Sequence, residues 1–151
     1  MTDQNLNSTF LRFYTDWVSA ISRKDWDWFE RHVADDFTGT ARPWPGFGLT
    51  KGQFIELDKQ IEEIDGEWQR VEAVKVGEHV HTVAVLLMKE ERFRQDSVIT
   101  DPSFSSEHFQ TLISGNEVRG KVICYTGIWR HDGTVWQVMD HRMIFEVASW
   151  D

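Results

Sequence analysis

Apolar residues in the first part of the chain recur at spacings of three and four. This spacing is typical of an amphipathic helix that buries one face. The residues that form this apolar stripe are Phe10, Phe13, Tyr14, Trp17, Val18 and Ile21. Asn7 or Ser8 precedes the stripe, and either side chain is a suitable N-cap. The pattern therefore predicts a first helix that begins near Asn7 and ends near Ile21.

Two further helices are predicted before the middle of the chain. Asp25 is a candidate N-cap for a short helix that turns Trp26, Phe29 and Val33 inward and ends before Asp35. A loop is expected over residues 39–48, which contain three Gly and two Pro. Thr50 and Gln53 have the spacing of a capping box. They predict a third helix with one apolar face, formed by Phe54, Leu57, Ile61 and Ile64.

From Gly66 onward the pattern changes to that of strands. Two strands are predicted over residues 67–76 and 79–93, joined by a turn at Gly77 and Glu78. A long polar connection, residues 94–117, is expected to act as a lid or a dimer contact. Residues 120–147 then form a hairpin whose turn is at 131–133. Helices followed by antiparallel strands predict a single α+β domain over residues 1–151, with three N-terminal helices packed on one face of a curved sheet.

Composition limits the classes of partner. The chain has 16 Lys and Arg against 25 Asp and Glu, a net charge of −9, which disfavours nucleic acid and anionic membrane surfaces. No apolar run reaches the roughly 18 residues of a membrane span, and the N-terminus lacks the layout of a secretory signal, so we expect a cytoplasmic protein. Eight Trp and ten Phe either form an aromatic-rich core or also line a ligand cavity or a subunit interface.

The last predicted strand carries ionisable residues in an apolar setting. Alternation places Asp140 and Arg142 on one face with Trp136 and Val138. On a cavity wall, Asp140 would lose solvation and its pKa would rise, which suits a general acid or base. Alternatively, Asp140 forms a structural salt bridge with Arg142 or Arg130. A register shift of one residue would instead turn Met139 or His141 inward.

Three segments resemble a known family: KDWDWFERHVADDF, RPWPGFGLTKGQF and YTGIWRHDGTVWQVMDHRMIF. They are similar to the SnoaL-like branch of the nuclear transport factor 2-like superfamily. The resemblance implies a cone-shaped fold of the cystatin-like type, whose cavity holds a small apolar ligand or substrate. Members of the superfamily include isomerases, cyclases, dehydratases, epoxide hydrolases and proteins that do no chemistry.

The resemblance also implies where functional residues lie. Positions used by steroid-isomerase-like members fall here on Trp17 and near Ala41, and epoxide-hydrolase-like members share only Asp140 of their Asp-Arg-Asp set. The candidate catalytic residues are Asp140, Tyr125 and Arg142. For Tyr125, simple packing in the core is the alternative. The candidate ligand-binding residues are Tyr14, Trp17, Phe37, Trp44, Phe54, Asp58, Ala84, Leu86, Met88, Ile123, Trp129, Trp136 and Val138.

Together these observations predict a protein that binds a small hydrophobic molecule. If it is an enzyme, we expect cofactor-free proton transfer on a cyclic, polyketide-like, terpenoid or steroid-like substrate. The alternative is a non-catalytic ligand-binding or accessory domain. His79 and His81 share a strand face but lack a third ligand, so no metal is expected, and no Gly-rich phosphate loop indicates a cofactor. The apolar face around His141, Met143 and Phe145 suggests a homodimer formed sheet to sheet.

Overall fold

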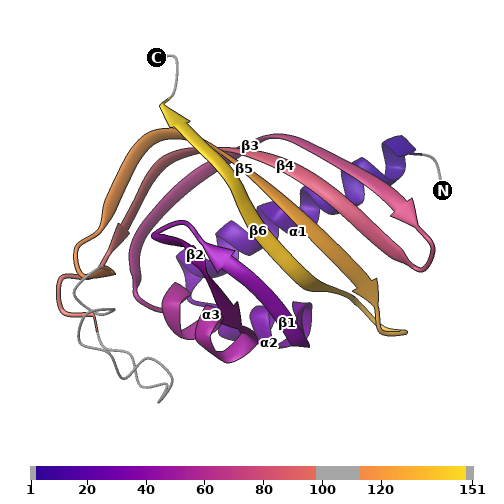
Figure 1. Ribbon diagram of the computed structural model, residues 1–151, viewed down its shortest axis with the longest axis horizontal. Helices are drawn as coiled ribbons and strands as arrows, with labels where there is room; N and C mark the ends of the chain where they lie inside the picture. The colour runs from indigo at the N-terminus through magenta and orange to yellow at the C-terminus, as the bar shows by residue number, and fades with distance from the viewer. Residues whose placement is uncertain (1–2, 98–112, 149–151) are drawn as a thin grey trace.

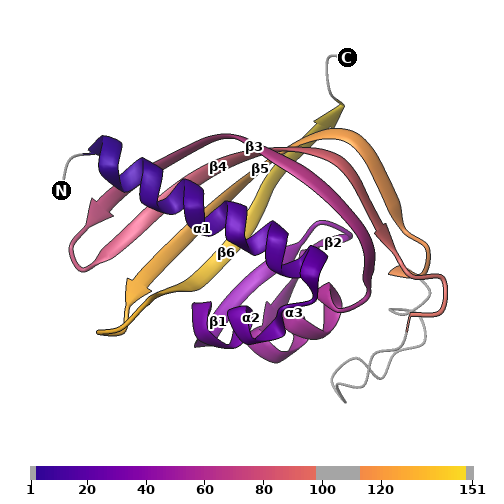
Figure 2. The same cartoon turned by 180° about the vertical axis from the view of Figure 1, so that it is seen from behind.

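The computed structural model describes residues 3–97 and 113–148. Within these ranges the order of elements is α1 (Asp3–Arg23), α2 (Trp26–His32), β1 (Val33–Ala41), β2 (Trp44–Thr50), α3 (Lys51–Asp58), β3 (Ile61–Val76), β4 (His79–Phe93), β5 (Glu117–His131) and β6 (Trp136–Ala148). The strands form one curved sheet in the order β2-β1-β6-β5-β4-β3, in which β1 and β6 pair in parallel and the other neighbours are antiparallel (Figure 1). Helix α1 crosses one face of the sheet, α2 lies near β1 and β6, and α3 lies near β1 and β2 (Figure 2). The predicted α+β class is confirmed.

The helix starts show which local signals were reliable. Asp25 caps α2, because its side chain accepts a hydrogen bond from the Trp28 backbone N–H at 3.3 Å. Thr50 and Gln53 form the predicted capping box of α3. The predicted cap of α1 is wrong, because this helix already begins at Asp3 and Asn7 lies inside it. The Asn7 side chain instead accepts a hydrogen bond from the Ala73 backbone N–H at 2.7 Å, which fixes α1 to β3.

Residues 39–48 do not form the predicted loop. They belong largely to the hairpin of β1 and β2, whose turn is Arg42-Pro43, so the three helices are not consecutive. Its glycines and prolines suggested a break in structure, but Pro and Gly are tolerated on an edge strand such as β2. Helix α3 also ends earlier than expected, at Asp58, because Ile61 already begins β3. Ile61 and Ile64 are therefore strand residues.

The two predicted antiparallel hairpins are confirmed. Gly77 adopts a positive φ of 62° in the turn between β3 and β4. In the turn between β5 and β6, the Asp132 carboxylate accepts hydrogen bonds from the backbone N–H groups of Thr134 and Val135. Strand β3 begins at Ile61, six residues before the predicted start at 67. Of the predicted connection over residues 94–117, residues 98–112 lie outside the described residues.

Irregular pairing in β6 decides which residues face the helices. Trp129 pairs with Val138 and Ile128 pairs with Asp140, so Met139 is an extra residue in β6. Such a bulge interrupts the alternation of faces along a strand. As a result Val138 and His141 are both buried, at 0% and 4% exposed, although three positions separate them. Asp140 is therefore turned to the outer face of the sheet.

Candidate functional site

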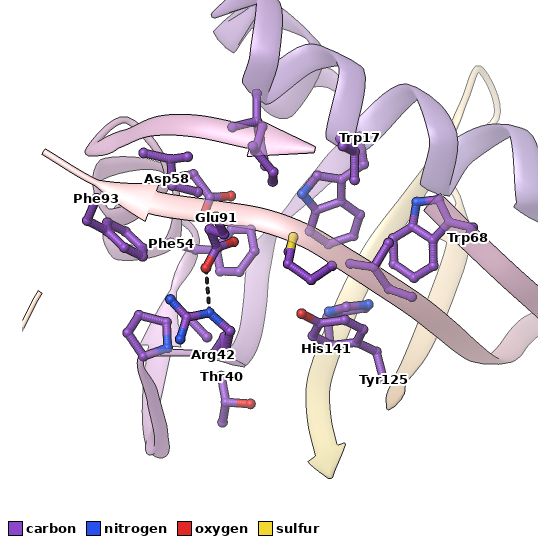
Figure 3. A pocket seen from close by; sticks show the side chains of 18 residues that line it. Trp17, Thr40, Arg42, Phe54, Asp58, Trp68, Glu91, Phe93, Tyr125 and His141 are labelled. Carbon is purple, nitrogen blue, oxygen red and sulfur yellow. Dashed lines mark hydrogen bonds and ion pairs between the residues drawn. The ribbon is translucent and has the colours of Figure 1, made fainter. Parts of the chain in front are cut away.

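A cavity of about 70 Å³ lies between helices α1 and α3 and the inner face of the sheet, and it is partly open to solvent. Its walls are mostly apolar, but the polar groups gather at two places (Figure 3). Arg42, Asp58 and Glu91 lie at one end, and His141 and Tyr125 lie at the other, near Trp17 and Trp68. The lining residues are Trp17, Val18, Ile21, Thr40, Ala41, Arg42, Pro43, Phe54, Asp58, Ile61, Ile64, Trp68, Leu86, Met88, Glu91, Phe93, Tyr125 and His141.

A buried ion pair forms the charged end of the cavity. Arg42 Nε donates to Glu91 Oε1 at 2.6 Å, and each side chain is only 8% exposed. Arg42 Nη2 also donates to Asn116 Oδ1 at 2.6 Å, so the guanidinium links the turn between β1 and β2 to the chain just before β5. Burial raises the pKa of Glu91, while Arg42 acts in the opposite direction. The pair places one positive and one negative charge on the wall, and these offset each other.

Asp58 is the unusual group of the cavity. It is the last residue of α3 and is 6% exposed. Its Oδ2 is fully buried and has no hydrogen-bond partner in the part of the chain that the structure describes. Burial is the main cause that raises the pKa of Asp58 well above its usual value; the negative charge of Glu91 adds to this, and a hydrogen bond with Trp17 opposes it. Asp58 therefore keeps its proton to a higher pH than an ordinary aspartate.

His141 lies among aromatic rings at the other end. Its ring centroid is 4.7 Å from that of Trp17 and 5.0 Å from that of Tyr125, with which it stacks. Burial lowers the pKa of His141 to about 3, so the imidazole is neutral over the ordinary pH range. Burial also raises the pKa of Tyr125. This end of the cavity is therefore uncharged.

The structure brings part of the predicted ligand-binding set together. Trp17, Phe54, Asp58, Leu86, Met88 and Tyr125 line the cavity. The other predicted residues whose side chains the structure describes do not line it. The core holds Tyr14, Phe37, Ala84, Trp129 and Val138, with the partly buried Trp136 packed against it, and Ile123 is buried in a second apolar cluster. The side chain of Trp44 lies outside the described residues.

Asp140 and Arg142 lie outside the cavity, so the predicted position of these two candidate catalytic residues is wrong. Arg142 Nε donates to Asp140 Oδ1 at 3.0 Å, and Thr38 Oγ1 donates to Asp140 Oδ2 at 2.9 Å. Their side chains are 25% and 54% exposed, and both border a shallow depression on the outer face. The cause is the bulge at Met139, which exchanged the faces of Asp140 and His141. Arg130, the other predicted partner, pairs with Asp36 instead.

Glu91 and Arg42 were missed as cavity residues, and His141 was expected there only as the result of a register shift. Glu91 belongs to a charged run that is typical of a solvated strand edge. In the structure, however, Asp65 pairs with Glu90 and Gly66 pairs with Met88, so Lys89 is an extra residue and Glu91 turns inward. For His141 a usable signal was present. Gly39 and Gly127 pair with it from the two neighbouring strands, and glycines inside strands mark places of close approach.

Comparisons with known proteins give the fold. No family model matches the chain, and no curated protein matches it. Among solved structures, an NTF2-like protein from Cytophaga hutchinsonii is 13% identical, with a TM-score of 0.65, and the match covers 95% of this chain and 98% of that one. The chain has the nuclear transport factor 2-like fold. A Caulobacter vibrioides protein with a cystatin-like fold is 12% identical, with a TM-score of 0.61 over 87% of this chain and 82% of that one.

The nuclear transport factor 2-like fold also occurs in the association domain of C. elegans CaMKII. That domain is 11% identical to this chain, with a TM-score of 0.62 over 95% of this chain and 98% of that one. Identities this low show a shared fold and do not transfer an activity. Within the described residues, no cluster of three or more His, Cys, Asp or Glu is placed to hold a metal ion. No helix in that part of the chain is long and apolar enough to cross a membrane.

Proposed function

We propose that the chain binds a small, uncharged, mainly apolar molecule in this cavity and recognises it through Asp58. The main support for this proposal is that Asp58 Oδ2 is buried and has no hydrogen-bond partner among the described residues. Nearly all buried polar atoms in folded proteins have a partner, because leaving one unsatisfied costs about 1–3 kcal/mol. A polar group of a bound ligand would remove that cost at Asp58, while the apolar walls contact the rest of the ligand.

The size and charge of the cavity narrow the ligand class. Arg42 and Glu91 offset each other, so a neutral ligand leaves no net charge unpaired. The cavity of about 70 Å³ is less than half the ~150 Å³ of an apolar cavity that accepts benzene. A single ring that extends toward the open side is therefore favoured over the fused rings of a steroid or polyketide.

The raised pKa of Asp58 supports a reaction as well as binding. A carboxyl group that is protonated over more of the pH range can donate a proton to a ligand and take one back. The proposed reaction is a cofactor-free proton transfer, such as an isomerisation, cyclisation or dehydration of a cyclic carbonyl compound. In this scheme Asp58 replaces Asp140 as the acid or base, and the aromatic walls exclude water.

Binding is tested first with cyclopentanone and cyclopent-2-enone. We expect either probe to shift the methyl NMR resonances of Met88 and Leu86, which line the cavity. The role of Asp58 is tested with a probe that has a second polar group. We expect 3-hydroxycyclopentanone to bind about 5-fold more tightly than cyclopentanone, because its hydroxyl group can form a hydrogen bond with Asp58, and Asp58→Leu should remove this gain. Asp140→Asn is the matched control, since this carboxylate lies on the outer face, and should leave binding unchanged. No methyl shift with any probe at millimolar concentration would overturn the proposal.

Catalysis is tested by deuterium exchange, which needs no knowledge of the natural substrate. Protein in D₂O should speed the exchange of protons next to the carbonyl of cyclopent-2-enone, followed by proton NMR. Asp58→Asn should abolish this acceleration, whereas Asp140→Asn should retain it. Binding without any acceleration of exchange would favour the second candidate function, a non-catalytic ligand-binding or accessory domain.

One observation favours the accessory function. Large apolar side chains are exposed near the C-terminal end of β6, namely Ile144, Phe145 and Val147. Exposed apolar patches often mark protein interfaces, and the fold is shared with an association domain. We propose a homodimer through this sheet face. Phe145→Glu should then lower the mass measured by analytical ultracentrifugation to that of a monomer. Leu11→Glu, at an exposed apolar residue of α1, is the control that should not.

A further inference from the structure

Four side chains from four different elements form one buried hydrogen-bonded chain that ends at the cavity. Trp129 Nε1 is 3.1 Å from Thr82 Oγ1, Thr82 Oγ1 is 2.9 Å from Tyr14 Oη, and Tyr14 Oη is 3.1 Å from His141 Nε2. Trp129, Thr82 and Tyr14 belong to β5, β4 and α1 and do not line the cavity, whereas His141 of β6 does. The chain therefore connects the core to the wall of the site.

The chemistry of Trp129 fixes the direction of these hydrogen bonds. An indole N–H can only donate, so Trp129 donates to Thr82 Oγ1. The Thr82 hydroxyl then has one acceptor within reach among the described residues, which is Tyr14 Oη. Tyr14 Oη accepts from Thr82, so its own hydrogen is directed to His141 Nε2. In this arrangement Trp129 Nε1–H and the hydroxyl groups of Thr82 and Tyr14 each have an acceptor, as buried donors in protein cores usually do.

The direction of the chain sets the tautomer of His141. Because Nε2 accepts a hydrogen bond, a neutral imidazole must carry its proton on Nδ1. The ring is neutral, since burial lowers its pKa to about 3, and the two nearby tyrosines, Tyr14 and Tyr125, have pKa values raised by burial. Nδ1 makes no hydrogen bond within the described part of the chain, and it is not completely enclosed by protein atoms. Because His141 lines the cavity, this nitrogen is available to a ligand bound there.

Two glycines leave room for this arrangement. A Cβ atom at Gly127 would lie 2.8 Å from Thr82 Oγ1, 2.9 Å from Tyr14 Oη and 3.0 Å from Trp129 Nε1. On the other side of β6, a Cβ atom at Gly39 would lie 2.5 Å from the backbone oxygen of His141. Neither contact is possible without moving the sheet or the hydrogen-bonded chain. The positions of His141 and its partners thus depend on the absence of side chains on both neighbouring strands.

The geometry points to His141 as a ligand-binding residue whose Nδ1–H donates a hydrogen bond to an acceptor oxygen of the ligand. This inference rests on the proposed function, because it requires a ligand in the cavity, and it narrows the ligand class to small rings that bear a carbonyl oxygen. A neutral imidazole donor polarises a carbonyl without adding a net charge to an apolar site. His141 and Asp58 lie toward different ends of the cavity (Figure 3), so one ligand can be held at two points.

The tautomer is measured without any ligand. In protein labelled with ¹⁵N-histidine, long-range proton–nitrogen correlation spectra distinguish a protonated Nδ1 from a protonated Nε2. We expect the His141 signals to show the Nδ1–H form, unchanged between pH 5 and 8. Tyr14→Phe removes the donor to Nε2 and should shift the ring toward a mixture of tautomers. An Nε2–H form, or titration within this pH range, in the wild-type protein would overturn the inference.

The ligand contact is measured with a pair of isosteres. Cyclopentanone has an acceptor oxygen, and methylenecyclopentane has a CH₂ group in its place. Cyclopentanone should bind about 5- to 10-fold more tightly and should shift the His141 Nδ1 resonance, as expected for one added hydrogen bond. His141→Asn keeps an N–H donor near the Nδ1 position and should retain this preference. His141→Gln moves the donor toward the Nε2 position and should lose it.

The outcomes separate the two proposals. Equal binding of both isosteres, with no shift of the Nδ1 resonance, would leave the binding cavity intact and overturn the role of His141. Absence of binding by either isostere, judged by the Met88 methyl resonance, would overturn the binding function and the role of His141 together. Should Tyr14→Phe fail to fold, Thr82→Val tests the same chain one step further from the cavity. It should also weaken the preference of His141 for the Nδ1–H form.

Discussion

Two arginine–carboxylate pairs lie on opposite faces of the same sheet and contrast in their surroundings. In the inner pair, Arg42 and Glu91 are each 8% exposed and their charged atoms are 2.6 Å apart. In the outer pair, Arg142 and Asp140 are 54% and 25% exposed and 3.0 Å apart. Solvent screens the outer pair, so its contribution to stability is small. The inner pair has lost its hydration, so each charge depends on the other.

The contrast shows why a carboxylate beside an arginine does not by itself mark a site. Asp140 accepts hydrogen bonds from Arg142 and Thr38, and its side chain is partly exposed to solvent. On the inner face, Arg42 satisfies Glu91, while the nearby Asp58 has an oxygen without a partner among the described residues. Burial combined with an unmet hydrogen bond, rather than charge alone, distinguishes the cavity.

The largest expected effect comes from breaking the inner pair. Arg42→Ala should lower the free energy of unfolding by about 3–5 kcal/mol at pH 8, because Glu91 is left buried without its partner. Without Arg42 the pKa of Glu91 rises further, so its folded form holds a proton more tightly and the loss should shrink toward pH 5. Urea denaturation at both pH values measures this difference.

A double variant provides the control for Arg42→Ala. Replacing both charges, with Arg42→Met and Glu91→Leu, leaves no unpaired ion and should recover most of the lost stability. If the double variant were as unstable as Arg42→Ala, the defect would come from lost packing rather than from an unpaired charge.

An added methyl group should destabilise the fold at a tightly packed glycine but not at an exposed one. Gly39→Ala should cost about 1–3 kcal/mol, since its Cβ would lie 2.5 Å from the His141 backbone oxygen and 2.5 Å from the Phe37 ring. Gly46→Ala is the matched control, because a Cβ there meets nothing within 4 Å. Thermal unfolding of both variants tests this prediction. Equal melting temperatures would show that β1 and β6 can move apart enough to hold the added methyl group.

The pH dependence of stability should reveal Asp58. Its folded pKa is raised, so the folded state binds a proton more tightly than the unfolded state. Stability is therefore lost as pH rises above about 4, the ordinary pKa of Asp, with a slope of up to about 1.4 kcal/mol per pH unit until the folded pKa is reached. Asp58→Asn should remove this slope and unfold at a higher temperature than wild type at pH 8. Parallel stability curves for the two proteins would mean that Asp58 is not protonated in the fold.

Local signals allowed much of the fold to be predicted. The capping box at Thr50 and Gln53, the cap at Asp25 and the turn at Gly77 each depend on residues within a few positions, and all were correct. The helix periodicity correctly turned Trp17 and Phe54 inward, and both line the cavity. The β1–β2 hairpin was missed because its glycines and prolines suggested a loop, although an edge strand such as β2 tolerates them. The parallel pairing of β1 with β6 joins distant parts of the chain and has no local signal.

The sequence pattern placed residues on the wrong face of the sheet wherever a bulge precedes them in the strand. Leu86 and Met88 follow simple alternation along β4 and line the cavity as expected. Beyond the extra residue Lys89, alternation misplaces Glu91, and beyond the extra residue Met139 it exchanges Asp140 and His141. Neither bulge has a local sequence signal, because the extra residue is defined only by the pairing of neighbouring strands.

The smallest expected effect belongs to the outer pair, and it is the sharpest test of the contrast between the two faces. Asp140→Asn removes the charge that Arg142 pairs with but leaves both side chains in contact with water. Because exposed pairs contribute about 0–1 kcal/mol, the free energy of unfolding should change by less than about 1 kcal/mol and the affinity for cyclopentanone should be unchanged. Urea denaturation and a ligand titration on the same sample measure both quantities. A stability loss above about 2 kcal/mol, or a loss of cyclopentanone binding, would contradict the contrast. It would mean that the outer face supports the cavity through Thr38 and the neighbouring β1 strand, which Asp140 contacts directly.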